Sequence, residues 1–174
     1  TVTQQAASTL DKASSLTVTA DAGTVKLDAS ALAKMSTAED DVVISIEKGT
    51  NADDGKYTFT ATSAGDNLFP EGQDNISITL TVPAPSGMTD NKVFVYYLGP
   101  KGAERINAEV KEVEGSQTVT WTVGHFSTYF VTTTEQSVSV TVDGTTTTYT
   151  DFSDALAQIE AGDTATVILL DDVT

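Results

Sequence analysis

The stretch from Ile76 to Val131 constrains the fold most, because four successive segments in it have the pattern of β-strands. Two of them, Ile76–Val82 and Thr118–Val123, alternate apolar and hydroxyl side chains with a period of two, as half-buried strands do. The segment Val93–Leu98 is apolar at every position, which is typical of a central strand covered on both faces. A fourth strand is expected at His125–Val131. We therefore predict a mainly β protein with a sandwich-like core.

The amino-acid composition favours the same fold class. The 174 residues include 30 threonines, which are β-branched, uncharged and suited to the solvent-exposed face of a strand. A chain of this length buries roughly 70% of its unfolded surface, so its core requires neither a metal nor a disulfide. The sequence has no cysteine, which excludes disulfides, thiolate catalysis and zinc–thiolate sites.

The chain is strongly acidic, with a formal net charge of −16 and a pI of about 4.1. Nucleic acids and anionic membrane surfaces would repel it, so neither is expected as a partner. Solubility in a crowded or salty exterior is the main explanation for the acidity, with calcium binding as the alternative. No apolar run has the length needed to cross a bilayer, and the first residues lack a basic and apolar leader. The lack of Met at position 1 and the strand-like end lead us to expect part of a longer protein.

Short helices are expected to interrupt the strands of the first half. Thr1 to Ser15 has a weak helical stripe, and Asp28 is placed to cap a helix through Met35. Leu68 and Phe69, within a long polar excursion, are expected to pack back as plugs. The further strands predicted by alternation and turn residues are Leu16–Ala20 and Thr24–Leu27 as a hairpin, Val42–Ile46, Lys56–Thr60, and Glu104–Val113 near an edge.

Residues 135–174 predict a ββαβ appendage. Asp143–Gly144 suits a hairpin turn with positive φ at both central positions. Asp151 is expected to cap a helix from Phe152 to Glu160 that presents one apolar face, and Thr164–Leu170 is a last strand. The apolar face of this helix is formed by Phe152, Ala155, Leu156 and Ile159. The sequence thus divides into a sandwich-like module with a helical lead-in over 1–134 and a segment over 135–174 that starts a further repeat or domain.

Two segments resemble known cell-surface sequences. The pattern of Val82–Pro83, Val93–Tyr97, Gly102 and Trp121–Tyr129 resembles a module of large Gram-positive cell-surface proteins that closes on an HFS-x-Y strand. Such proteins often carry S-layer homology repeats or sortase-anchored ends. The segment from Tyr149 to Val173 resembles the entry to parallel β-helix or repeat regions of similar proteins. The resemblance covers about half of the chain and implies a bacterial surface location; it implies no reaction.

Residues capable of chemistry are present but do not form a catalytic pattern. His125 is the single histidine, and its alternating register would place it beside Ser127 and Tyr129 at a strand entry. A lone titratable group without a base or a nucleophile carries no mechanism, so we expect a structural hydrogen bond there. The adjacent acids Glu39, Asp40 and Asp41 could mimic a glycosidase pair, but such runs are usually a solvated face. We predict no enzyme, no catalytic residue and no cofactor.

The sequence also contains candidates for four other kinds of site, two for binding and two for covalent modification. The loop Asn51–Gly55 offers oxygen donors for calcium but lacks the EF-hand spacing, and Asp171 and Asp172 are weaker candidates, so no metal site is predicted. An aromatic platform for sugars is the second kind, and burial of its rings in the core is the competing interpretation. Asn75 begins an N-glycosylation acceptor, which we discount for a bacterial protein, and Lys26 or Lys92 could form an intramolecular crosslink with Asn or Asp. The platform would consist of Trp121, Tyr96, Tyr97 and Tyr129.

These patterns together favour a non-catalytic extracellular module of a bacterial cell-surface protein, acting as stalk, spacer or adhesion scaffold at the surface or in the cell wall. The alternative is a carbohydrate-binding module of a surface or secreted glycan-active protein. Host or cell-wall glycans or proteins are the expected partners, no membrane insertion is expected for this part of the protein, and we expect a monomer. The sequence leaves the ligand-binding residues unknown.

Overall fold

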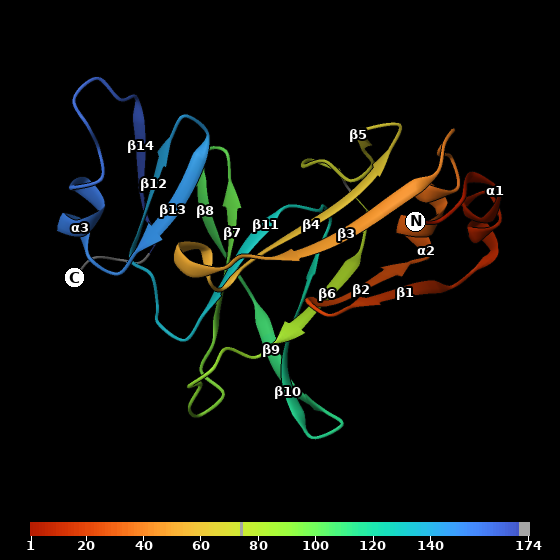
Figure 1. Ribbon diagram of the computed structural model, residues 1–174, viewed down its shortest axis with the longest axis horizontal. Coiled ribbons are helices and arrows are strands. Elements are labelled where there is room, and N and C mark those ends of the chain that lie inside the picture. Colours follow the sequence, from red (N-terminus) through yellow and green to blue (C-terminus); the bar gives the residue numbers. More distant parts are fainter. Residues whose placement is uncertain (74, 171–174) are drawn as a thin grey trace. The chain divides into compact units, whose positions relative to one another are not determined.

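The computed structural model describes residues 1–73 and 75–170 and shows a mainly β protein, with 48% of residues in strands and 12% in helices. The chain forms two compact units (Figure 1). The first unit consists of Thr1–Ala84 and Ala108–Ser127, and the second of Pro85–Asn107 and Thr128–Thr174. The chain therefore leaves the first unit after Ala84, returns to it at Ala108 and leaves it again after Ser127. The boundary between residues 134 and 135 that the sequence suggests stays a prediction.

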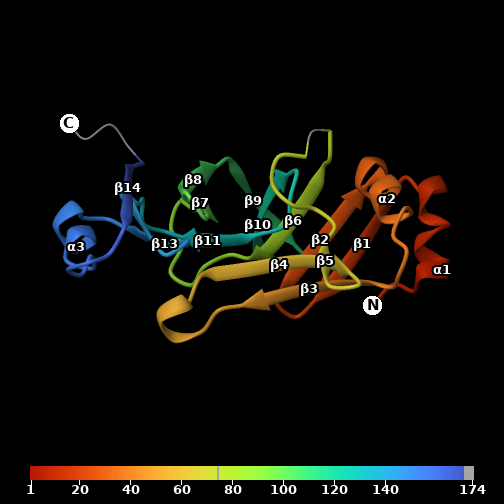
Figure 2. The same cartoon turned by 90° about the horizontal axis from the view of Figure 1, so that it is seen from above.

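The first unit contains a five-stranded antiparallel sheet in the order β1-β2-β6-β10-β9 and a second antiparallel pair, β3 and β4, extended by the short β5. Figure 2 shows β3 and β4 running side by side as a long hairpin. The strands of the first unit are β1 (Ser15–Ala20), β2 (Gly23–Asp28), β3 (Val42–Lys48), β4 (Lys56–Ser63), β5 (Asp66–Asn67), β6 (Ile78–Pro83), β9 (Ala108–Val113) and β10 (Ser116–Val123). Its helices are α1 (Gln4–Ala7), η1 (Leu10–Lys12), α2 (Ala29–Met35) and η2 (Asn51–Asp53).

Alternation of side chains builds the core of this unit. In β6 and β10 every second residue is buried, and the intervening threonines face outward, where Thr81 and Thr120 pair across the strands with hydroxyl oxygens 2.9 Å apart. β4 buries Tyr57 and Phe59 in the same way. The Phe59 ring meets the Trp121 ring edge-on, with centroids 6.1 Å apart, a geometry that aromatic pairs prefer. This contact joins β4 to β10 and confirms the sandwich-like core.

A helix cap and an isolated bridge tie the helices of the first unit to its strands. Asp28 ends β2 and caps α2, because its carboxylate accepts hydrogen bonds from the backbone N–H groups of Ser30 (2.9 Å) and Ala31 (3.1 Å). At the N-terminus Val2 forms an isolated antiparallel bridge with Val42. The predicted hairpin, the Asp28 cap and the buried Phe69 are confirmed, and the weak helical stripe becomes α1 and η1.

The second unit contains two sheets, β11-β7-β8 and β13-β12-β14. β7 is buried at five of its six positions, as its unbroken apolar sequence predicts. The second sheet with α3 is the predicted ββαβ arrangement, and its hairpin turns at Asp143 and Gly144, whose φ angles are 49° and 78°. The elements are β7 (Phe94–Gly99), β8 (Gly102–Ile106), β11 (Thr128–Thr132), β12 (Val138–Val142), β13 (Thr145–Tyr149), α3 (Phe152–Leu156) and β14 (Ala165–Leu169).

Three predicted elements differ from the structure. The single strand expected over Glu104–Val113 is two strands, β8 and β9, which separate at Asn107 and pair with different partners in different units. The last strand of the core begins at Thr128, so the alternation expected from His125 onward does not hold. The helix expected over Phe152–Glu160 ends at Leu156 and leaves half of its apolar face uncovered.

Candidate functional site

The second unit contains a group of polar contacts, most of them buried, that fastens its two sheets together, and we call this group the polar junction. It comprises Tyr96, Arg105, Glu135 and Gln136 at the entry to β12, and the hydroxyls of Ser139, Thr141 and Thr146 further along the sheet. β12 makes this possible because its alternation puts valines on one face and hydroxyls on the other. The valine face takes Ala155 of α3, and the hydroxyl side chains bond to one another and to β7 and β8.

The hydroxyl part of the junction bonds directly to the backbone of the β7–β8 hairpin. Ser139 is fully buried, and its Oγ accepts a hydrogen bond from the Ala103 N–H at 3.2 Å. Thr146 Oγ1 donates to the Gly99 carbonyl and lies 2.7 Å from Thr141 Oγ1. Because burial of an unpaired N–H or hydroxyl is costly, these bonds fix which groups of the two sheets face each other.

A glycine lets the two sheets approach this closely. A Cβ on Gly102 would lie 2.1 Å from Cδ1 of Ile168 in β14, and the φ of Gly102 is +144°. The backbone angle therefore favours glycine, and a side chain here would also require the end of the Ile168 side chain to shift.

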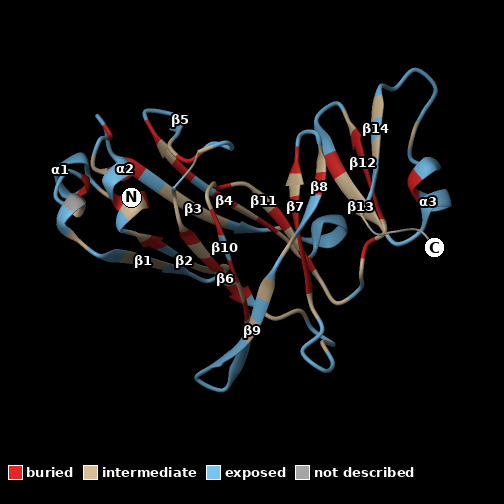
Figure 3. Ribbon diagram, turned by 180° about the vertical axis from the view of Figure 1, so that it is seen from behind, coloured by how far each residue is buried: buried red, intermediate tan, exposed pale blue. Residues whose placement is uncertain are grey.

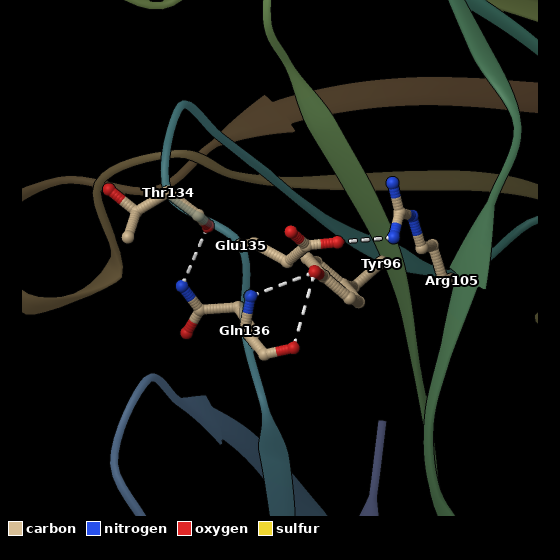
Figure 4. A network of polar contacts seen from close by, with 5 residues as sticks. All are labelled: Tyr96, Arg105, Thr134, Glu135 and Gln136. Carbon is tan, nitrogen blue, oxygen red and sulfur yellow. Dashed lines mark hydrogen bonds and ion pairs between the residues drawn. The ribbon is translucent and has the colours of Figure 1, made fainter. Parts of the chain in front are cut away.

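The entry to β12 is held by Tyr96 from β7 (Figure 4). Its hydroxyl accepts a hydrogen bond from the Gln136 N–H at 2.8 Å and donates to the Gln136 carbonyl at 3.4 Å. The Gln136 side chain donates to the Thr134 carbonyl at 2.9 Å. Tyr96 is fully buried, and its one phenol bonds both backbone groups of Gln136.

Charged groups flank this entry. Arg105 of β8 forms an ion pair with Glu135, and its guanidinium carbon lies 4.9 Å from the centroid of the Phe94 ring. Lys92 lies over the same ring at 5.4 Å. Both partners of the ion pair are partly exposed, so the pair orients the segment more than it stabilises it. Together these contacts join the entry to β12 with β7 and β8.

The aromatic residues proposed as a sugar platform lie in the cores of the two units. Trp121 is 2% exposed and belongs to the first unit, and Tyr96, Tyr97 and Tyr129 are at most 9% exposed in the second. The Tyr97 and Tyr129 rings lie 5.9 Å apart at 47°. A carbohydrate platform needs open ring faces, and these four rings do not offer them. Burial of Trp121 in the core is therefore confirmed.

The histidine is partly buried, whereas the acidic candidates are exposed. His125 is partly buried in the segment between β10 and β11. Glu39, Asp40 and Asp41 are exposed, and Asp41 accepts a hydrogen bond from the Gln4 N–H at 2.8 Å, which ties α1 to the start of β3. Within residues 1–73 and 75–170, no three acidic or histidine side chains converge as metal ligands would.

Lysines neutralise the acids of the candidate calcium loop. Lys56 Nζ lies 2.7 Å from Asp53, and Lys48 Nζ lies 3.5 Å from Asp54. A cation would have to displace both lysines before the carboxylates could bind it. Asp171 and Asp172 lie outside the described residues.

The modification candidates are on the surface. Lys26, Lys92 and Asn75 are all exposed, and Asn75 has a φ of 65° directly before the β6 segment. Neither lysine is buried beside a carboxyl or an amide in the way an intramolecular crosslink needs for its chemistry.

Sequence reasoning found the buried rings but missed the polar junction. Ser139, Thr141 and Thr146 belong to a Ser- and Thr-rich hairpin whose hydroxyls look alike in the sequence. The one available signal was the absence of Lys, Arg, Asp and Glu within β12 and β13, since a strand exposed on one face normally carries some charge.

No helix among the described residues is long and apolar enough to cross a membrane. Comparison with protein-family models, with curated proteins and with solved structures found no match.

Proposed function

We propose that this chain is a non-catalytic structural or adhesion module of a bacterial cell-surface protein, where it serves as a stalk, spacer or scaffold. The observation that carries the proposal is the burial of Trp121, Tyr96, Tyr97 and Tyr129. These rings are among the largest side chains of the chain, and they stabilise the sheets instead of lining a binding face.

The polar junction supports a mechanical role. A stalk or spacer must keep its parts in a fixed arrangement, and a joint made of directional hydrogen bonds does so better than apolar packing alone. The high acidity and the absence of cysteine agree with an exposed bacterial location. The sequence resemblance to Gram-positive surface modules points the same way.

Two experiments test the proposal. An antibody against this chain should label intact cells of the producing organism, and brief protease treatment of those cells should remove the signal. Labelling that appears only after lysis would refute the surface location.

The second experiment is a glycan array probed with the purified chain, with and without calcium. We expect no binding in either condition. Specific binding that a ring substitution such as Trp121→Phe leaves intact would favour the carbohydrate-binding alternative through a surface other than the four rings.

A further inference from the structure

β14 is an unprotected edge of the small sheet in the second unit. Over the described residues, β14 pairs with β12 on one side, and the order β13-β12-β14 places it at the edge. Its five residues, Ala165–Leu169, include no charge and no proline. The edge strand β9 of the first unit, by contrast, carries Glu109, Lys111 and Glu112. Charges and prolines are the usual protection against added strands, so β9 is protected and β14 is not.

The hydrogen-bond register shows which backbone groups of β14 are available. The Leu170 N–H donates to the Ser137 carbonyl at 2.8 Å. Two and four residues further along β12, Ser139 faces Ile168 and Thr141 faces Thr166. Hydrogen-bonded pairs alternate in an antiparallel ladder. The amides of Val167 and Leu169 therefore point away from β12, toward the free edge, where an added strand would pair with them.

Apolar side chains lie exposed on the same part of the unit. Leu169 is 53% exposed on β14, and Phe152 and Leu156 are 49% and 44% exposed on α3. The helix contacts β12 and β13, and its buried Ala155 belongs to the apolar cluster against which Ala165 and Val167 of β14 pack. Figure 3 shows α3 and β14 coloured mostly as exposed or intermediate. We call the free edge of β14 together with these three side chains the β14 surface.

The charges on the segment that carries the β14 surface have one sign. Residues 135–170 contain six acidic residues and no lysine or arginine, and of the six only Glu135 has an ion-pair partner among the described contacts. Asp154, Glu160 and Asp163 are exposed on α3 and on the connection to β14. This field attracts a basic segment and repels a second copy of the same acidic chain.

We propose that the β14 surface binds an extended, basic segment of a partner protein, which adds to β14 as a fourth strand of the sheet. Backbone hydrogen bonds to Val167 and Leu169 hold the segment. Its apolar side chains cover Leu169 and the open face of α3, and its lysines or arginines face the acids. The proposal does not depend on the cell-surface role.

The test uses two synthetic peptides, acetyl-KVKVKVK-amide and acetyl-EVEVEVE-amide, titrated into the whole chain at low salt. Calorimetry should give a dissociation constant at least about tenfold lower for the basic peptide, because opposite charges favour and like charges oppose association. Hydrogen exchange followed by NMR should slow at the amides of Val167 and Leu169. Equal affinity for the two peptides, or unchanged exchange at these amides, would overturn the proposal.

Two controls separate strand addition from simple charge attraction. A basic peptide with every backbone nitrogen methylated keeps its charge but has no edge that can pair with β14, so its binding should fall to the level that charge attraction alone supports. In the chain, Leu169→Pro removes an outward N–H at a position where an edge strand tolerates proline. It should weaken binding while the circular dichroism spectrum is unchanged. Full binding by the methylated peptide would overturn the proposal.

Charge variants complete the design. The double variant Asp154→Asn with Glu160→Gln should weaken binding of the basic peptide several-fold. The matched variant Glu109→Gln with Glu112→Gln on β9 should leave it unchanged. If sedimentation shows that the free chain dimerises and the dimer protects the β14 amides, the occupant is a second copy and the proposal is wrong.

Discussion

Asp28 connects three segments of the first unit through one carboxylate. It caps α2, accepts a hydrogen bond from the Ser30 hydroxyl, and through that hydroxyl reaches the Ser77 N–H at 3.1 Å. Burial raises the pKa of the Asp28 carboxyl, but the hydrogen bonds from Ser30 and Ala31 together outweigh it and hold the pKa below its usual value of 3.8. The ionised carboxylate is therefore the form that the fold stabilises.

We expect Asp28→Ala to lower the free energy of unfolding at pH 7 by about 1 kcal/mol, because α2 loses its cap. The folded-state pKa is lowered, so the stability from ionisation is present above the unfolded-state pKa and is lost as pH falls through the folded-state value. The difference between wild type and variant should thus shrink in acid. Urea denaturation at neutral and acidic pH measures it.

The variant Asp28→Asn is the control, since Asn also caps helices but carries no charge. It should retain most of the stability at pH 7 and flatten the pH dependence. A loss that is the same at every pH would contradict the role given to ionisation.

Glu114 occupies a position that its side chain disfavours. It and Gly115 form the two-residue turn between β9 and β10 with φ of 51° and 79°, which is a type I′ turn that prefers Asn-Gly. We expect Glu114→Asn to raise the free energy of unfolding by about 0.5–1 kcal/mol, as relief of left-handed strain. Thermal denaturation measures it. Asp143→Asn, in the matching turn of the second unit, should change little, because Asp already tolerates positive φ; an equal gain at both turns would contradict the argument.

At the scale of elements, strands that alternate could be predicted and points where a strand changes sheets could not. β6 and β10 follow from the alternation of their side chains and β7 from its unbroken apolar run, because burial of one or both faces dictates the residue type at each position. The break at Asn107 has no turn residue other than Asn107 itself, and the polar pattern of Glu104–Val113 continues across it. Each half pairs with its neighbour in the sequence, β8 with β7 and β9 with β10, so two hairpins meet at Asn107, and the continuous polar pattern does not mark where one ends and the other begins.

The candidate site likewise has a part that the local sequence pattern predicts and a part that it does not. Burial of the aromatic rings could be predicted, because Trp121 alternates in phase with Val119 and Val123. The polar junction could not, because Ser139 bonds to Ala103, which lies 36 residues away in the sequence. The shortened α3 was also missed: its apolar positions indicated burial, but the helix ends at Leu156.

The polar junction gives a prediction at this scale. Ser139→Ala should lower the free energy of unfolding by about 1–3 kcal/mol, because the buried Ala103 N–H loses its acceptor. Hydrogen exchange in β12 and β13 should also become faster. Urea denaturation and exchange by mass spectrometry measure both effects. The control Ser116→Ala, at the exposed start of β10, should stay within about 0.5 kcal/mol of wild type; an equal effect at both positions would contradict the role of the junction.

At the scale of the whole molecule, like charges oppose folding. The chain has 25 acidic and 9 basic residues, so compaction brings negative charges together. Raising the salt from about 0.01 M to about 0.15 M shortens the screening length from about 30 Å to about 8 Å. We expect a gain of about 1 kcal/mol, which corresponds to a rise in Tm of about 2–4 °C for a chain of this size.

Differential scanning calorimetry measures this shift, and NaCl and KCl at the same concentration should give the same result, because screening depends on ionic strength. A fall in Tm with salt would show that attractive ion pairs outweigh the repulsion.

The return of the chain to the first unit at Ala108 has a consequence for biosynthesis. β6 lies between β2 and β10 in its sheet, yet residues 85–107, which belong to the second unit, are translated between β6 and β10. A ribosome must therefore deliver β10 in full before the apolar side chains of Ile78, Leu80 and Val82 gain their neighbours on that side. Until then the nascent chain carries a half-built sheet, and we expect chaperones that recognise exposed strands to bind it during this interval.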